Sequence, residues 1–282
     1  MTATGRSTPD PGRLLAELAG KGESAFDVAE AALALAALRR PGQSLDPYRA
    51  HLRELVQDVA DRAAGLPPAA VDQAAVLAEV LAVRHGYSGD EETYDDLANA
   101  DLMQVIDRRR GLPVTLGILY IHAGRAQGWD VVGLNFPGHF LIRVQGGDAE
   151  RVIIDPFHGG RRLEAHDLRE LLKTVQGQAA ELSPEVYQPL TDRSVVMRLL
   201  NNVKLRHMEG SRFAQALETV TDMQRLAPDD PALWRERGLL HMRVGDLPGA
   251  IGALDEYIAR APEGPDRTRI DLVLQELRQR LH

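Results

Sequence analysis

The chain has 282 residues, of which 44% are hydrophobic and 26% are charged, a composition typical of a globular protein with one large or two ordinary domains. Its net charge of −8 argues against a broad surface for nucleic acid or anionic membranes. Because the chain contains no cysteine, disulfides, thiolate metal sites, iron–sulfur clusters and thiol nucleophiles are excluded.

The first residues are polar and rich in Thr, Ser, Pro and Gly, which predicts a disordered tail over residues 1–11. They contain no apolar run of the kind that forms a signal peptide or a membrane anchor. We therefore expect a cytoplasmic protein that binds neither membranes nor nucleic acid.

Helical periodicity dominates the region that follows. Apolar side chains recur at helical spacing from Leu14 onward, and the pattern stops at Pro41 and again at Gly65, which two prolines follow. An acidic, turn-rich stretch over residues 87–101 precedes one more short helix. These features predict a helical lobe over residues 12–110.

The pattern changes at Gly111. Pro113 suits the first position of a helix, and most residues up to Ala123 are apolar or small, so we expect a helix that is buried on most sides. Three short runs rich in Val, Ile and Phe follow, over residues 131–134, 140–144 and 152–154. A buried helix followed by a small antiparallel sheet predicts an α+β core over residues 111–165.

The last third, residues 191–282, is helical again and contains a repeat. The pattern A-P-x-x-P occurs twice, and its first prolines, Pro228 and Pro262, lie 34 residues apart. A period of this length resembles the tetratricopeptide repeat. The resemblance implies α-helical hairpins that bind proteins, and we expect Trp234 and His241 to contribute to their surface.

A histidine and an aspartate stand out in the predicted sheet. His139 opens the run "HFLIRV" and Asp155 ends the run "RVIID". A symmetric hairpin would pair His139 with Asp155 and Leu141 with Ile153, and a slip of two residues would still leave His139 and Asp155 on one face. Their side chains would then be close enough for the carboxylate to orient the ring, as in a catalytic triad. A buried His–Asp pair that only stabilises the sheet would have the same pattern.

Three motifs in order resemble one protein family: "GLPVTLGILY", "GLNFPGHFLIRV" and "IIDPFHGG". Together they resemble the transglutaminase-like superfamily, in its SirB-type bacterial branch. The resemblance covers about residues 25–170, within a predicted domain over residues 12–190. In that superfamily a nucleophilic cysteine opens a buried helix, and a histidine and an aspartate lie on adjoining strands. The resemblance implies that His139 and Asp155 occupy the positions of the catalytic histidine and aspartate.

The position of the nucleophile departs from the family pattern. It falls at the start of the Pro113 helix, on Thr115 or Val114, and neither residue is cysteine. A threonine hydroxyl ionises far less readily than a thiol, so a neighbouring histidine must remove its proton during attack. Its β-branched carbon also restricts approach. A threonine at the start of a helix more often caps the helix or packs in the core.

Other side chains can belong to the same candidate site. We expect four residues to line a cleft around His139: Phe136, Phe140, Phe157 and His158. The three phenylalanines can equally form a small core. His139, Asp155 and His158 lack the tight spacing of metal ligands, so we expect no metal. No glycine loop has phosphate-binding spacing, so we expect no cofactor.

Two functions from different classes fit these residues. A chain that keeps the histidine and the aspartate without the thiol is expected to be a pseudoenzyme, which binds a peptide or protein segment in a degenerate cleft and through its repeats. The alternative is a hydrolase or acyltransferase with Thr115 as nucleophile, His139 as base and Asp155 to orient it. In a third interpretation His139 and Asp155 are purely structural. We favour the non-catalytic binding or scaffolding protein.

Overall fold

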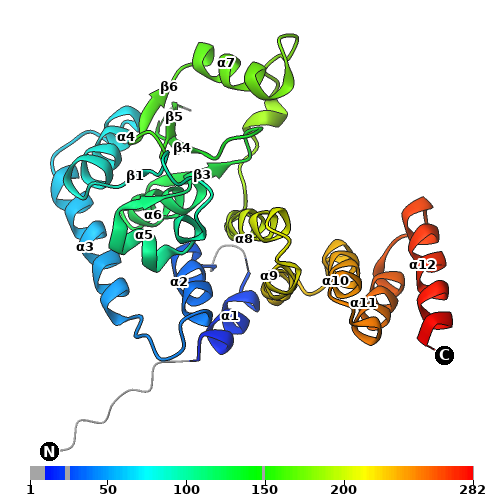
Figure 1. The fold of residues 1–282 in the computed structure, drawn as a ribbon. Helices are drawn as coiled ribbons and strands as arrows, with labels where there is room; N and C mark the ends of the chain where they lie inside the picture. The colour runs from blue at the N-terminus through cyan, green and yellow to red at the C-terminus, as the bar shows by residue number, and fades with distance from the viewer. Residues whose placement is uncertain (1–9, 23–25, 148–149, 282) are drawn as a thin grey trace, which may run out of the picture. The chain divides into compact units, whose positions relative to one another are not determined.

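The computed structural model describes residues 10–22, 26–147 and 150–281, and the chain divides into two compact units, Met1–Leu199 and Leu200–His282 (Figure 1). Of the predicted tail over residues 1–11, residues 1–9 lie outside the described residues. Helix α1 (Pro11–Ala19) already begins at Pro11, because proline suits the first turn and the Asp10 carboxylate accepts a hydrogen bond from the N–H of Arg13.

Helices dominate the described part of the region up to residue 110, as the periodicity predicted. Aspartates cap three more of them: Asp27 accepts hydrogen bonds from two N–H groups at the start of α2, Asp96 accepts one at the start of η3, and Asp101 accepts one at the start of α5. The helical elements of this region after α1 are α2 (Val28–Leu38), α3 (Asp46–Ala63), α4 (Ala70–Ala78), the π-helical η2 (Glu79–Arg84), the 3₁₀-helical η3 (Leu97–Ala100) and α5 (Leu102–Arg108). Each helix in the described ranges is too short or too polar to cross a membrane.

Helix α6 (Pro113–Arg125) begins at the predicted proline and is buried along nearly its whole length. Two glycines on it make room for the sheet. A Cβ at Gly117 would clash with the ring of Phe140, and one at Gly124 would lie 2.7 Å from the side chain of Val131. Glycine at these two positions therefore lets the sheet approach the helix closely.

Four antiparallel strands form the sheet in the order β3–β4–β5–β6. Three of them match the predicted runs: β3 (Asp130–Leu134), β4 (Leu141–Gln145) and β5 (Arg151–Asp155). The fourth, β6 (Arg161–Leu163), is too short for its sequence pattern to reveal it. A separate parallel pair, β1 (Ser88–Gly89) with β2 (Arg110–Gly111), joins the acidic loop to the residues before α6.

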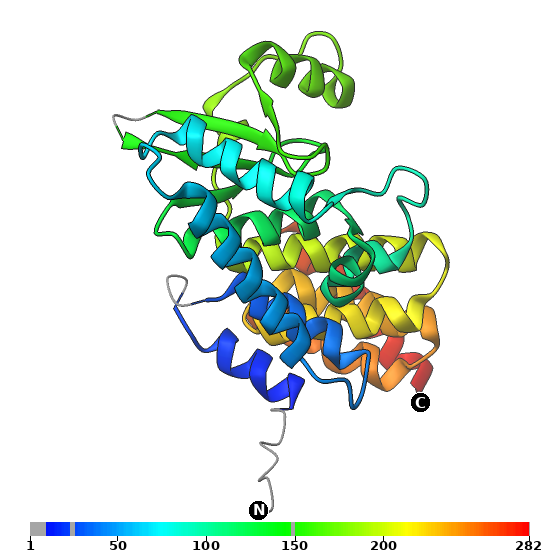
Figure 2. The same cartoon turned by 90° about the vertical axis from the view of Figure 1, so that its left-hand side faces the viewer.

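The two faces of the sheet pack against different elements. Helices α4 and α6 contact β4 on one face, and α6 also contacts β3 (Figures 1 and 2). On the other face, Leu141 and Leu163 pack with Leu168 and Leu172 of α7 (Ala165–Gln176). A buried helix, a small antiparallel sheet and helical repeats confirm the predicted α+β fold class.

The second unit has the predicted period. Helices α9 (Phe213–Leu226) and α11 (Leu247–Arg260) start 34 residues apart, and so do α10 (Pro231–Val244) and α12 (Pro265–Leu281). The helix before them, α8 (Asp192–Glu209), runs across the boundary between the units.

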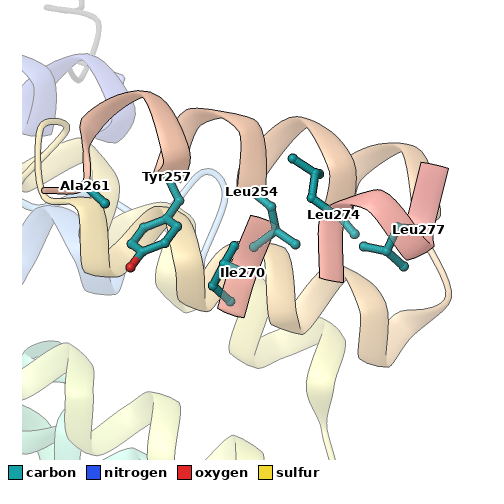
Figure 3. Packing of buried hydrophobic residues seen from close by; sticks show 7 residues of the cluster. Leu254, Tyr257, Ala261, Ile270, Leu274 and Leu277 are labelled. Atoms are coloured by element: carbon teal, nitrogen blue, oxygen red, sulfur yellow. The ribbon is translucent and has the colours of Figure 1, made fainter. Parts of the chain in front are cut away.

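Close packing holds α10, α11 and α12 together. A Cβ at Gly238 of α10 would lie 2.5 Å from the Leu254 side chain, so this glycine lets α10 approach α11. Leu254 and Tyr257 of α11 meet Ile270 and Leu274 of α12 in one apolar cluster (Figure 3). The repeat unit thus has a core of its own.

Candidate functional site at the start of helix α6 and the ends of strands β4 and β5

The β4–β5 hairpin has a register that differs from the symmetric prediction. Ile142 pairs with Ile154 and Gln145 with Arg151, so the pairing is shifted by two residues and His139 lies before the first residue of β4. The predicted pairing of His139 with Asp155 is therefore wrong. At the hairpin tip the N–H of Gly146 donates to the carbonyl of Glu150 at 3.0 Å, which continues the observed register, and the Glu150 carboxylate accepts a hydrogen bond of 2.9 Å from the N–H of Ala70 at the start of α4.

Thr115 lies in the first turn of α6, and its side chain is fully buried. Its hydroxyl donates a hydrogen bond of 2.9 Å to the backbone carbonyl of Asn99 in η3. The same carbonyl accepts the N–H of Leu112, also at 2.9 Å. The hydroxyl thus ties η3 to the start of α6. Val114, the other residue at the nucleophile position, is also buried and has only an apolar side chain.

His139 is half-buried and is held mainly through its backbone. Its N–H donates to the carbonyl of Phe136 at 3.0 Å, and its own carbonyl accepts a hydrogen bond of 2.7 Å from Arg198 of α8. Among the described residues, none makes a hydrogen bond to its ring. Burial is the main cause that lowers the pKa of His139. The negative charge of Asp155 raises this pKa, and the positive charges of His158 and Arg198 lower it further. The ring is therefore neutral at neutral pH.

Asp155 is 5% exposed, and local hydrogen bonds occupy its carboxylate. One oxygen accepts the N–H of Phe157 at 2.9 Å and that of His158 at 3.4 Å, and the other lies 2.7 Å from Nδ1 of His158. The structure therefore pairs Asp155 with His158 rather than with His139. The His158 side chain is 53% exposed, so this second His–Asp pair lies at the surface.

The three phenylalanines have different surroundings. Phe136 and Phe140 are buried, and the Phe140 ring lies against both Gly117 and Gly133. They are therefore core residues, one of the two roles that the sequence left open. Phe157 is half-buried, and its ring meets that of Tyr94 edge-on at 5.8 Å. It lies beside His158, with ring centroids 5.2 Å apart, at the exposed edge of the site.

Sequence reasoning missed three residues that shape the site. Arg198 donates hydrogen bonds to the carbonyl of His139 and to the side chain of Asn135, and nothing in its helical segment indicates this. Asn99 supplies the carbonyl that Thr115 binds. Tyr120 of α6 is buried, and its hydroxyl has no hydrogen-bond partner among the described residues. Burial and the nearby Asp155 raise the pKa of Tyr120, so the phenol stays protonated.

No metal site is evident in the described ranges, because no group of three or more His, Cys, Asp or Glu side chains there is placed to hold an ion.

Trp234 and His241, the two residues that the sequence assigned to the repeat surface, are both half-buried in the second unit. Trp234 donates from its indole N–H to the carbonyl of Pro228 at 3.0 Å, and Nδ1 of His241 lies 2.8 Å from Asp246.

Two family models match the chain: the transglutaminase-like superfamily over residues 46–201, and the tetratricopeptide repeat over residues 203–275. The chain belongs to the transglutaminase-like superfamily. The resemblance inferred from the three motifs and from the 34-residue period is thereby confirmed.

Three relatives that match the chain are bacterial proteins. UPF0162 protein PA3419 of Pseudomonas aeruginosa is 33% identical over 78% of this chain and 79% of its own length. A UPF0162 protein of Xylella fastidiosa is 33% identical over 63% of this chain and 64% of its own length, so the chain spans less than two thirds of that relative. Protein SirB1 of Salmonella typhimurium is 26% identical over 67% of this chain and 71% of its own length. These matches place this member of the superfamily in the SirB-type branch.

Proposed function

We propose that the chain is a non-catalytic member of the transglutaminase-like superfamily that binds a peptide or protein segment beside His139 and through its helical repeats. The observation that carries this proposal is the state of Thr115. Its side chain is fully buried, and its hydroxyl proton is used in a hydrogen bond to the Asn99 carbonyl. A nucleophile must instead be open to substrate and give its proton to a base.

The His–Asp pairing supports the same conclusion. Catalysis by a triad needs the aspartate to orient the histidine that acts as base. Here the Asp155 carboxylate is taken up by His158 and by two backbone N–H groups. His139 therefore has no carboxylate among the described residues hydrogen-bonded to its ring to hold it in the orientation of a base, although the charge of Asp155 still favours its protonated form.

The same residues are suited to binding. A half-buried neutral imidazole can both donate and accept a hydrogen bond, and no described residue satisfies the ring of His139. The exposed His158 and the half-buried Phe157 lie beside Asp155 and offer polar and apolar contacts. Tetratricopeptide repeats over residues 203–275 suggest a second protein-binding surface. A cytoplasmic location and the absence of nucleic-acid partners stay predictions.

The competing function, a hydrolase or acyltransferase with Thr115 as nucleophile, is tested by covalent labelling. Full-length protein is treated with fluorophosphonate and β-lactone probes over the pH range in which histidine titrates, and adducts are mapped by mass spectrometry. We expect no adduct on Thr115. We also expect Thr115→Val to fold and to lose only about 1 kcal/mol of stability, the usual worth of one hydrogen bond.

The control is His139→Ala, which should cost little stability because its ring has no hydrogen-bond partner among the described residues. An adduct on Thr115 that disappears in His139→Ala would establish the enzyme instead. Partners captured from the native cell should be retained by Thr115→Val, since the hydroxyl is buried and, among the described residues, its hydrogen bond goes to the Asn99 carbonyl.

A further inference from the structure

A groove lies on the face of the sheet that carries α7, and it is not lined by Thr115, His139 or Asp155. Its volume is about 780 Å³, within the range of pockets that hold ligands. Strands β4, β5 and β6, helix α7 and the segment over residues 182–189 line it. Its apolar lining includes Ile153, Leu168 and Leu182, and its cationic lining includes Arg143, Arg151 and Arg169.

Strand alternation places two of these arginines on the groove side. Ile142 of β4 packs toward Gly117 of α6, so its neighbour Arg143 projects from the opposite face. Arg143 pairs with Ile153, and Arg151 precedes Ile153 by two residues, so it shares that face. The two arginines are thus diagonal neighbours on adjacent strands, with Cα atoms about 7–8 Å apart.

Four arginines and one carboxylate, Glu164, line the groove, and Glu164 compensates the charge of Arg162 alone among the described residues. No described carboxylate lies within 4.0 Å of Arg143, Arg151 or Arg169, whereas Arg162 is paired with Glu164 at 2.8 Å. Nε of Arg143 is buried and has no hydrogen-bond partner among the described residues. Because Arg143 is half-buried, solvent screens its charge less than that of an exposed arginine, so an anion in the groove would interact with it more strongly.

We propose that this groove binds an acidic, extended segment of a partner protein. In an extended chain, side chains at alternate positions project from the same side about 6.6–6.8 Å apart, close to the spacing of the two diagonal arginines. Two glutamates or aspartates at such positions would accept hydrogen bonds from Arg143 and Arg151. Apolar side chains of the segment would pack on Ile153, Leu168 and Leu182. The proposal is independent of the site at His139.

The test uses the full-length protein and a short fluorescein-labelled peptide in which glutamate and valine alternate. Fluorescence anisotropy measures its binding, and the same peptide with glutamine in place of glutamate is the reference. We expect the glutamate peptide to bind at least about tenfold more tightly, the effect of one or more charge-assisted hydrogen bonds. Rising salt should weaken its binding.

Matched variants locate the site. Arg151→Gln removes an exposed arginine of the groove and should weaken binding about tenfold, and Arg143→Gln at least as much. Arg53→Gln removes the same charge from an exposed position on α3 and should change affinity less than about twofold, the effect of one distant screened charge. Circular dichroism checks that each variant is folded.

Three results would overturn the proposal. The first is no binding of the glutamate peptide by wild-type protein. The second is an equal loss in Arg53→Gln and Arg151→Gln, which would indicate attraction to net charge alone. The third is that inorganic phosphate or a short single-stranded RNA binds through Arg143 and Arg151 while the peptide does not. Binding should persist in His139→Ala, which separates this groove from the site proposed above.

Discussion

Replacing Phe140 with alanine is expected to lower the free energy of unfolding by about 3–5 kcal/mol, the cost of removing a buried aromatic ring. Phe140 is 2% exposed, and its ring lies between α6 and β3, where a Cβ at Gly133 would be only 2.7 Å away. Urea denaturation followed by far-ultraviolet circular dichroism measures the change. The control is Val83→Ala in the same unit. Because the Val83 side chain is 80% exposed, this change should alter the free energy of unfolding by less than about 0.5 kcal/mol. Equal costs for the two variants would contradict the packing described.

A double-mutant cycle identifies the contact that causes this loss. Gly117→Ala alone should destabilise by about 1–3 kcal/mol, because the added methyl group clashes with the Phe140 ring. In the Phe140→Ala background the methyl group has room, and alanine is a better helix former than glycine. The double variant should therefore be more stable than the sum of the single effects predicts by at least about 1 kcal/mol. Simple additivity would show that the two residues are not in contact.

Leu254→Ala in the repeat unit is expected to cost about 2–5 kcal/mol, since Leu254 is fully buried in the cluster of Figure 3. The chain offers a matched control of the same residue type. Leu272 of α12 is 57% exposed, so Leu272→Ala should be nearly neutral. If both changes cost the same, the proposed core of α10–α12 would be wrong.

The two tryptophans report on the two units separately. Trp129 belongs to the first compact unit and Trp234 to the second. In Trp129→Phe protein, the remaining fluorescence follows the repeats, and in Trp234→Phe protein it follows the transglutaminase-like unit. We expect Leu254→Ala to shift the unfolding midpoint reported by Trp234 more than that reported by Trp129. Equal shifts would mean that the units unfold as one cooperative structure.

Local patterns were sufficient to predict most elements of the fold. Pro113 marks the start of α6 because proline suits the first turn of a helix. The period of 34 residues predicts the helical hairpins because each repeat packs on the next in the same way. Strand β6 could not be predicted, because three residues carry too little alternation to reveal a strand.

The site was harder to predict because its pairings depend on competing contacts. The His139–Asp155 pairing assumed a symmetric hairpin, but the bond from Ala70 to Glu150 accompanies a different register, and it joins residues 80 positions apart. Asp155 also has partners much nearer in sequence. An aspartate at the start of a turn commonly accepts the N–H groups that follow it, and "DPFHGG" has the proline and glycines of such a turn. This signal could have indicated that His158 would compete with His139.

Thr115 illustrates the same limit. Its position in the first turn of α6 was predictable, but its hydrogen-bond acceptor was not. The acceptor is the carbonyl of Asn99, in a 3₁₀ turn that precedes α5. Only the folded chain brings that carbonyl to the hydroxyl, so the sequence could not show whether Thr115 faces a cleft or the interior.

Reaction of a single cysteine at position 115 with iodoacetamide tests the closed, non-catalytic site most directly. The natural chain has no cysteine, so Thr115→Cys restores the thiol of the family pattern as the only reactive thiol. Val83→Cys, at an 80% exposed position, serves as the open reference. We predict that the thiol of folded Thr115→Cys protein is protected and that it reacts at the rate of the reference only after unfolding in urea. Rapid alkylation of the folded variant, slowed by His139→Ala, would show an open site with an activating histidine and would contradict the proposal.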